Sequence, residues 1–529
     1  IALLFAVHPI HVEAVANIKS RDEILAMLFA LLALNLFIQH YQTGRWVFLG
    51  LSALCLTLGA MSKEGALTYL AVIPIAVVFL MEGDWKRKAI ALLKYPMLLV
   101  FIVATFLLLT GKMPGSPSPV APKGYMESLT LGNCMATDRV KQGDWTRIGN
   151  SGFLFWKNLE KFFYPVDLVY FSGYNMYAVK DWNVNRLLLG TLFTIHNLAI
   201  VLSLVFWRRI RVLAFGFWYY IFTISIYLQL PGFLLADTIA DRYLFLPSLG
   251  LCIMVVAAAY KLLRIPEEEN AISWLGRSVG KVTSLQKGKG IALTAVFVVL
   301  AVVLSGMTML RNRVWKSNLS LFSHDLPLLE NCARAHYYYA SELAKGLPTS
   351  SNPAQDRGEM ILHYQKAIAI TPQSYYAYVR LGQQYLNFKE YRAVVDLMDD
   401  ALRYYPGQGD IWHLKGMGHY YLAQYEEAAP AMLQARMLAP ELDDNWEFLA
   451  RAYERGGHYE EVLATLNEAL SRNATYVYYY DVLSDTYFDM GDTLNSFPPI
   501  LQLLDLDGNN PLWWRKLIGR YQIIGDADK

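Results

Sequence analysis

The stretch Tyr375–Pro406, YYAYVRLGQQYLNFKEYRAVVDLMDDALRYYP, carries the pattern that decides the fold of the C-terminal part of this chain. It contains the spaced set Tyr378, Leu381, Gly382 and Tyr385, and equivalent residues recur at steps of 34 positions. The recurring sets are Tyr378, Trp412, Trp446, Tyr480 and Trp514; Ala367, Ala401, Ala435 and Ala469; and Pro372, Pro406 and Pro440. A fixed period of this length predicts a repeat architecture.

This period and these residue types are typical of tetratricopeptide repeats, in which each unit is a pair of helices. Such units stack because each buries its apolar face only against its neighbours, and the stack has a concave groove for a peptide or partner protein. We expect an array of about five repeats and a terminal helix over 336–529. Trp412 and Trp446 should be core residues at equivalent positions, and we interpret most of the many tyrosines as packing residues.

The first 310 residues have a different character, with apolar stretches that approach the roughly 20 residues a helix needs to cross a bilayer. The mean hydropathy of +0.25 together with 17% charged residues indicates two unlike parts. We therefore expect an all-α chain: a polytopic transmembrane bundle over 1–310, a connector at 311–335 and the repeats. Candidate spans are 24–41, 92–111, 187–207, 211–230, 243–263 and 291–310, with shorter runs at 46–61 and 66–81.

Basic residues predict the orientation of these spans, because Lys and Arg are enriched in short cytoplasmic loops. Arg45, the run Lys86–Lys88, the connection 208–211 and the connection 261–290 all fall on one face if the spans alternate. The other, external face then receives 8–23, 62–65, the long loop 112–186, 231–242 and everything after 310. The aromatic and lysine-containing end of the loop 112–186 favours a helix in the membrane interface, where it could also hold a lipid-linked substrate.

Three motifs rich in ionisable groups lie on this external face at the ends of spans. They are His8-Pro-Ile-His11-Val-Glu13 continuing to Arg21-Asp22-Glu23, then Lys63-Glu64, and then Asp241-Arg242-Tyr243. Charges at helix ends often only mark where the membrane stops. Three such motifs on one side favour a functional site, because ionisable residues near membrane depth are costly.

Other functional classes have little support in the sequence. A net charge of +2 argues against a nucleic-acid partner. His8, His11 and Glu13 do not share one helical face, and the four cysteines form no metal-type cluster, so we expect no metal site. Cys134 and Cys332 both lie on the external side of this topology, where a disulfide between them is one alternative and simple packing of Cys332 is the other.

In their order along the chain, these motifs, with Trp315 and Leu321-Phe322 leading into the repeats, resemble one family. The chain is similar to transmembrane O-mannosyltransferases that carry tetratricopeptide repeats, and to their bacterial relatives. The resemblance implies a GT-C-type glycosyltransferase that moves a sugar from a polyprenyl-phosphate donor to Ser or Thr of a protein outside the cytoplasm. The sequence of residues 16–24 is more similar to that of bacterial members, which favours a bacterial inner membrane with periplasmic repeats over an ER membrane with luminal repeats.

The chemistry of such a donor suggests roles for the charged residues. A leaving phosphate needs cationic donors, for which arginine is well suited, and the acceptor hydroxyl needs a carboxylate to take its proton. The candidates for phosphate binding are Arg242, Arg21 and Lys63, with His8 and His11 as further contacts. The carboxylate candidates are Glu13, Asp22, Glu64 and Asp241. The motifs identify no certain cofactor, and the lipid-linked sugar is expected as the donor substrate.

Two other interpretations and one gap remain open. The chain begins inside the apolar run Ile1–Val7, which we read as a missing N-terminus, and the main catalytic base of this family type would then precede Ile1. A membrane-anchored scaffold that assembles proteins on its repeats is one alternative function. A transporter is the other, with His196 as its intramembrane candidate.

Overall fold

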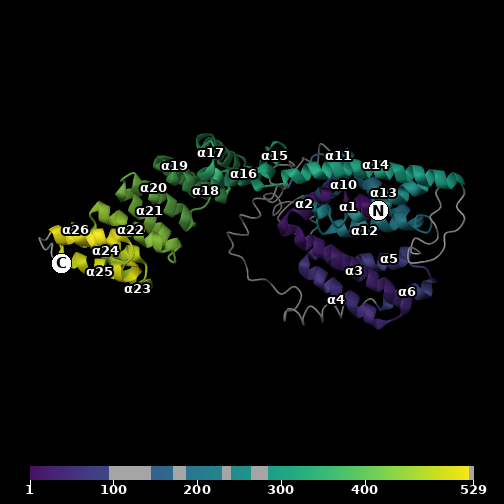
Figure 1. Cartoon of the computed structure of the whole chain (residues 1–529), viewed down its shortest axis with the longest axis horizontal. Coiled ribbons are helices and arrows are strands. Elements are labelled where there is room, and N and C mark those ends of the chain that lie inside the picture. Colours follow the sequence, from purple (N-terminus) through teal and green to yellow (C-terminus); the bar gives the residue numbers. More distant parts are fainter. Residues whose placement is uncertain (95–143, 171–185, 229–239, 264–283, 524–529) are drawn as a thin grey trace. The chain divides into compact units, whose positions relative to one another are not determined.

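The computed structural model describes residues 1–94, 144–170, 186–228, 240–263 and 284–523, and every regular element in these ranges is a helix (Figure 1). The chain divides into two compact units, Ile1–Glu342 and Leu343–Lys529. The domain borders expected at 310 and 336 stay predictions. Cys134, most of the span expected at 92–111 and the opening of the loop 112–186 lie outside the described residues.

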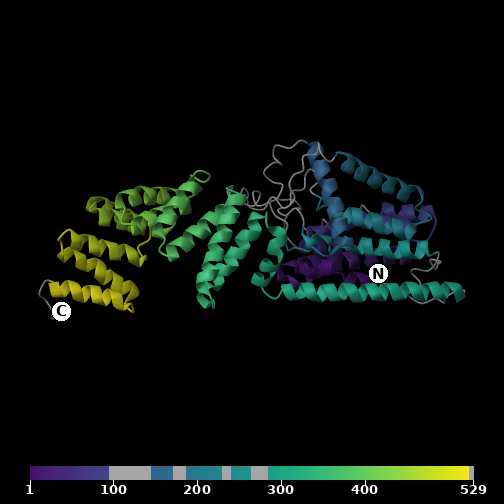
Figure 2. The ribbon, with the colours of Figure 1, turned by 90° about the horizontal axis from the view of Figure 1, so that it is seen from above.

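The first unit is a set of helices that alternate with short 3-10 turns. Its helices are α1 (Ala2–Ala6), α2 (Val12–Ala16), α3 (Arg21–Thr43), α4 (Trp46–Ser62), α5 (Tyr69–Leu80), α6 (Trp85–Leu93), α10 (Asp144–Phe163), α11 (Arg186–Val205), α12 (Arg211–Ser225), α13 (Ser248–Leu262), α14 (Ser284–Val314), α15 (Asn318–Asp325) and the start of α16 (Ala333–Gly346). The 3-10 turns that matter below are η1 (Pro9–His11), η3 (Glu64–Thr68) and η4 (Asp241–Leu244). Figure 2 shows α14 as one long helix along the edge of this unit.

Small residues allow the central helices of this unit to pack closely. The turn between α3 and α4 places Gly44 at a φ of +74°, where a side chain would be strained. Between α12 and α13, a Cβ atom on Gly216 would lie 2.8 Å from the carbonyl oxygen of Gly250, and one on Gly250 would lie 2.7 Å from that of Gly216. Only glycine at both positions permits this crossing, which brings the end of α12 and the start of α13 beside the motifs described below.

Two of the described helices are long and apolar enough to cross a membrane, within Ile18–Thr43 and Gly288–Val314. The other apolar helices of this unit are shorter, at Trp46–Ser62, Glu64–Leu80, Thr194–Val205 and Ser248–Leu262. With only two helices of membrane-spanning length among the described residues, the polytopic bundle expected from the sequence is not confirmed. On α14, large apolar side chains such as Ile291, Val299 and Val302 are between 64 and 72% exposed.

The four basic connections noted in the sequence gather at one end of the first unit. Lys261 donates a hydrogen bond to the carbonyl of Arg209, and the Lys88 ammonium lies 5.9 Å from the centre of the Trp207 ring. Arg87 donates to the carbonyl of Tyr41 at 3.2 Å, and Lys94 lies 4.8 Å from the Trp46 ring centre. Lys289 donates to Leu263 at 3.3 Å. These contacts bring the basic connections together, while the side of a membrane on which they lie stays a prediction.

The second unit is a series of helix pairs. After α17 (Pro353–Ile370) come α18 (Tyr375–Asn387) with α19 (Tyr391–Leu402), α20 (Gly409–Tyr421) with α21 (Tyr425–Leu438), α22 (Asp443–Gly456) with α23 (Tyr459–Arg472), α24 (Val477–Asp489) with α25 (Phe497–Asp507), and the single helix α26 (Pro511–Ile523). The first helices begin at 375, 409, 443, 477 and 511, a step of 34 throughout. The period in the sequence is thus the period of the fold.

One hydrogen bond repeats with the same period and explains the aromatic residue near the start of α20, α22, α24 and α26. The ring donor of Trp412, Trp446, Tyr480 or Trp514 binds the carbonyl of the residue six positions earlier. The four distances lie between 2.8 and 3.0 Å. The aromatic side chain therefore fixes the turn that connects one repeat to the next.

Burial at this position varies along the array. Trp446 is 2% exposed and packs with Val462, Leu466 and Tyr479. The guanidinium groups of Arg436 and Arg472 lie 4.6 and 5.4 Å from the centre of its ring. Trp412 is only half-buried, so the expectation that both tryptophans are core residues is wrong for Trp412.

We expect Trp446→Ala to lower the free energy of unfolding by about 3–5 kcal/mol, because it deletes a large buried aromatic side chain. Trp412→Ala should cost clearly less, because part of that ring already faces solvent. Denaturant unfolding of the full chain in detergent, followed by hydrogen exchange of α20 and α22, measures both. Equal losses for the two variants would contradict this assignment of the core.

Candidate functional site

The three ionisable motifs of the sequence come together at one end of the first unit. Each lies in a short turn where one helix ends and the next begins: η1 and α2, the junction of α4 with η3, and η4 before α13. Pro9 begins η1, and the ring nitrogen Nδ1 of His8 accepts a hydrogen bond from the backbone of Ile10 at 3.2 Å. These turns bring polar side chains from distant parts of the chain together at the ends of the apolar helices.

An ion pair joins the first and the third motif across 229 positions of sequence. The Glu13 carboxylate accepts hydrogen bonds from the guanidinium of Arg242 and, at 2.9 Å, from the backbone N–H of the same residue. The Glu13 side chain is 2% exposed and that of Arg242 is 21% exposed. Burial raises the pKa of Glu13 to about 7, although the charge of Arg242 opposes this.

A second buried pair is formed by Asp241 and Lys161, whose nitrogen lies 2.6 Å from a carboxylate oxygen. Lys161 belongs to α10, which packs Phe155 and Phe162 into the same apolar cluster as Tyr220 and Leu244. The sequence suggested a helix in the membrane interface for this region. In the structure the lysine is instead 6% exposed, because the aromatic face of α10 packs against the other helices.

A third pair lies beside the first two and comes from the end of α14. Arg311 binds both carboxylate oxygens of Asp325, at 2.5 and 2.7 Å, and Asp325 also accepts from the backbone N–H of Tyr170 at 2.9 Å. Asp241 and Glu13 both lie within electrostatic reach of Arg311. The buried cations Lys161 and Arg311 thus flank the pair of Glu13 and Arg242.

The second motif forms the more open side of this cluster. The Lys63 ammonium lies 3.1 Å from Asp22 and 3.6 Å from Glu23. The side chains of Asp22 and Lys63 are 31 and 21% exposed, whereas Glu23 is 3% exposed. The charges of Glu23 and Arg242 interact, so Asp22, Glu23 and Lys63 belong to the same cluster as the ion pairs described above.

The two histidines of the first motif are held by other partners. His8 stacks on Phe162 at 4.5 Å and bonds its carbonyl oxygen through Nε2 at 3.0 Å. His11 bonds the hydroxyl of Ser248 through Nε2 at 2.7 Å. Burial lowers the pKa of His8 to about 4 and that of His11 to about 3, so both rings are neutral at pH 7. They position η1 against α10 and α13, and they carry no positive charge toward a phosphate.

The structure therefore joins most of the candidate residues and adds others. Glu13, Asp22, Lys63, Asp241 and Arg242 belong to one polar cluster, while Arg21 and Glu64 are exposed at its edge. Lys161, Arg311 and Asp325 were not among the candidates. For Arg311 a signal existed, because it is the first charged residue after the apolar run 291–310. No three His, Cys, Asp or Glu side chains in the described part of the chain are grouped to hold a metal ion.

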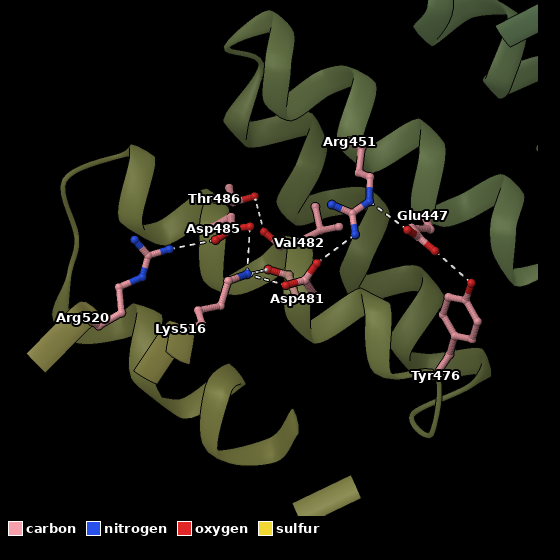
Figure 3. A network of polar contacts seen from close by, with 9 residues as sticks. All are labelled: Glu447, Arg451, Tyr476, Asp481, Val482, Asp485, Thr486, Lys516 and Arg520. Carbon is pink, nitrogen blue, oxygen red and sulfur yellow. Dashed lines mark hydrogen bonds and ion pairs between the residues drawn. The ribbon is translucent and has the colours of Figure 1, made fainter. Parts of the chain in front are cut away.

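The second unit carries a separate line of charged residues across α22, α24 and α26, which are the first helices of three successive repeats (Figure 3). Arg451 of α22 lies 2.8 Å from both Glu447 and Asp481, and Lys516 of α26 binds Asp481 as well as Asp485, the latter at 2.8 Å. Arg520 lies 2.7 Å from Asp485. Alternating charges at these aligned positions bind α22, α24 and α26 together.

Together these features define a helical protein with membrane-length helices, a polar site at their ends and a tetratricopeptide-type array. No family model matches the chain. It is similar to the human protein O-mannosyl-transferase TMTC1, with 25% identity over 72% of this chain and 43% of that protein. It is also similar to the Caenorhabditis elegans protein O-mannosyl-transferase F38B6.6, with 25% identity over 64% of this chain and 41% of that protein.

Mouse protein O-mannosyl-transferase TMTC3 matches 98% of this chain at 22% identity, over 52% of its own length. The chain thus spans about half the length of the curated relatives it matches. These relatives confirm the resemblance to O-mannosyltransferases that the sequence motifs indicated. Among solved structures, the chain is similar to YrrB, described as a tetratricopeptide-repeat protein, with a TM-score of 0.32 and 16% identity over 37% of this chain and 96% of that one.

The charge line of the second unit predicts a pH-dependent stability. Burial raises the pKa of Asp481, but Lys516 and Arg451 outweigh it and hold the pKa below the usual 3.8. Ionised Asp481 therefore stabilises the fold above about pH 4, and this contribution is lost as the pH falls through the lower, folded-state pKa. We expect Asp481→Asn to destabilise the array by about 1–3 kcal/mol at pH 7.

The measurement is hydrogen exchange of α22, α24 and α26 in the full chain, as a function of pH. The exposed Asp505→Asn is the matched control and should behave like the parent at all pH values. A loss for Asp481→Asn that persists undiminished at pH 3 and below would contradict the assigned ion pairs.

Proposed function

We propose that this chain is part of a membrane-embedded glycosyltransferase. It transfers a sugar, mannose by analogy with its relatives, from a polyprenyl-phosphate donor to Ser or Thr of a protein on the external face. The repeats recruit the acceptor polypeptide. The observation that carries the proposal is the convergence of three distant charged motifs into one cluster that contains the cations Arg242, Lys161, Arg311 and Lys63.

A multi-pass arrangement in the membrane agrees with two features of the first unit. The apolar side chains of α14 are highly exposed, which is costly in water and favourable in hydrocarbon. The basic connections lie together at one end, as expected for a cytoplasmic face. The polar cluster is formed by turns at the opposite ends of the same helices, so we place it on the external side.

The proposed reaction assigns different tasks to the cations and the carboxylates. The acceptor oxygen attacks the anomeric carbon, the bond from that carbon to the phosphate oxygen breaks, and the acceptor proton passes to a carboxylate. Negative charge grows on the phosphate as the sugar leaves, so the partly exposed Arg242 would bind it more strongly in the transition state than before, and the buried charge of Lys161 would favour this without direct contact. Glu13 holds the guanidinium in place for contact with the phosphate, because its carboxylate binds both the side chain and the backbone N–H of Arg242.

Exposure separates the carboxylate candidates. Glu13 and Asp241 are buried in ion pairs with Arg242 and Lys161, so we assign them to orienting those cations. Asp22 is partly exposed and Glu64 is exposed, so these two can reach an acceptor hydroxyl. The Asp22 carboxylate lies 3.1 Å from the Lys63 ammonium, and we assign it to take the proton of an acceptor hydroxyl positioned against it.

We expect Arg242→Ala to lower the rate of sugar transfer by about 10²–10³, as for the loss of other donors that stabilise developing charge. Arg242→Lys should restore only part of the rate, because a point charge replaces the planar fork that binds two oxygens. The assay is mannose transfer from polyprenyl-phosphate mannose to an acceptor peptide by purified protein. Arg313→Ala, an exposed arginine near the end of α14, is the control and should keep the parent rate. Rates within twofold of the parent for both Arg242 variants would place the donor elsewhere.

The second unit should lie on the same external side as the polar cluster. A cysteine in place of the 75% exposed Arg403 should react with a membrane-impermeant maleimide in intact spheroplasts, above the background of the parent chain. A cysteine in place of Arg208, in one of the basic connections, should react only after the membrane is opened. The reverse pattern would invert the proposed topology, and with it the side on which transfer occurs.

A further inference from the structure

The hydroxyl of Tyr227 is a buried polar group inside the cluster for which the described residues supply no hydrogen-bond partner. The residue follows α12 and is 2% exposed. Buried hydroxyl groups almost always have a partner, because leaving one unpaired is costly. An unpaired hydroxyl at the edge of a proposed active site points to a ligand that completes it.

The surrounding residues hold this hydroxyl in place. The Tyr227 ring stacks on Tyr243 with their centres 4.5 Å apart and 15° between their planes. The guanidinium of Arg242 lies 5.0 Å from the centre of the same Tyr243 ring. On the other side, a Cβ atom on Gly65 would lie 2.8 Å from the Tyr227 hydroxyl oxygen. The hydroxyl is therefore fixed between the second and the third motif.

A second unsatisfied atom lies in the same place. The Oε1 atom of Glu23 accepts no hydrogen bond from any described residue, and its nearest cation is Lys63 at 3.6 Å. Glu23, Glu64 and Arg242 all lie within electrostatic reach of Tyr227. Lys63, which contacts Glu23, is 21% exposed, and its partner Asp22 is 31% exposed, so this part of the cluster is open to a ligand.

The chemistry of these groups selects a neutral ligand with several hydroxyl groups. A phosphate would be repelled by Glu23 and Glu64, and it is better served by Arg242 and Lys161. A sugar hydroxyl can donate to the Glu23 carboxylate and accept from Tyr227 or Lys63. The sugar is bonded directly to the phosphate of the donor, so the sugar subsite must adjoin the cations that bind the phosphate. Tyr227, Glu23 and Lys63 meet this condition because they lie beside Arg242.

We propose that Tyr227, Glu23 and Lys63 form the subsite that binds the hydroxyl groups of the transferred sugar, next to Arg242 at the donor phosphate. This inference rests on the proposed function. It separates the cluster into a sugar side, formed by α3 and the junction of α4 with η3, and a phosphate side, formed by η4 and α10.

The test compares two buried tyrosines, of which only one has a hydroxyl that is hydrogen-bonded to another described residue. Tyr227→Phe removes an unpaired group, so the melting temperature should stay the same or rise. Its kcat/KM for transfer from polyprenyl-phosphate mannose should fall about tenfold, the loss of one good hydrogen bond to the substrate. The matched control is Tyr219→Phe, whose hydroxyl is paired with that of Tyr69 at 2.6 Å. This control should lower the melting temperature and leave transfer per folded molecule unchanged.

Donors with a deoxy sugar separate contact from an indirect effect. For the analogue lacking the hydroxyl that Tyr227 binds, parent and Tyr227→Phe should transfer at the same rate. A tenfold difference that persists with every deoxy donor would overturn the contact, as would transfer by Tyr227→Phe within twofold of the parent. A melting temperature lowered as much as in Tyr219→Phe would show an internal partner and overturn it too. If the parent itself transfers no sugar, the proposed function fails, and this subsite fails with it.

Discussion

The arrangement of the first unit depends on the cost of placing charges among apolar helices. Glu13 and Arg242 are 229 positions apart, yet each is tolerated where it lies because it neutralises the other. This pair fixes η1 and α2 against η4. In the same way, the ion pair of Asp241 with Lys161 joins η4 to α10, and that of Asp325 with Arg311 joins α15 to α14. The histidines, held neutral by burial, complete the contacts of η1.

From the sequence, the charged residues at the ends of apolar runs could be identified, but not all the residues with which they form ion pairs. Residues such as Glu13, Lys63 and Arg242 could be found because they interrupt apolar runs at the ends of predicted spans. Lys161 could not, because its surroundings also fit a helix on the membrane surface, and only tertiary packing shows that its aromatic face is buried. The opposite is true of Arg21, which has the right charge and position along the chain but is exposed at the edge of the cluster.

The repeat array was more predictable because its information is local and repeated. A 34-residue step in the sequence becomes a 34-residue step in helix starts, and Trp412, Trp446, Tyr480 and Trp514 each make the same hydrogen bond to the preceding turn. Sequence could not distinguish the buried Trp446 from the half-buried Trp412, because their difference comes from neighbours outside the repeated pattern, among them Arg436 and Arg472. The alternating charges of Arg451, Asp481 and Lys516 likewise become meaningful only when successive units are aligned.

The crossing of α12 and α13 at Gly216 and Gly250 has a mechanical consequence for the site. The two backbones touch at this point, so a Cβ atom at either position would overlap the carbonyl oxygen of the facing glycine. The segment that follows α12 carries Tyr227, and the turn that precedes α13 carries Arg242. A side chain larger than hydrogen at either glycine would therefore force the two helices apart and change the spacing between Tyr227 and Arg242.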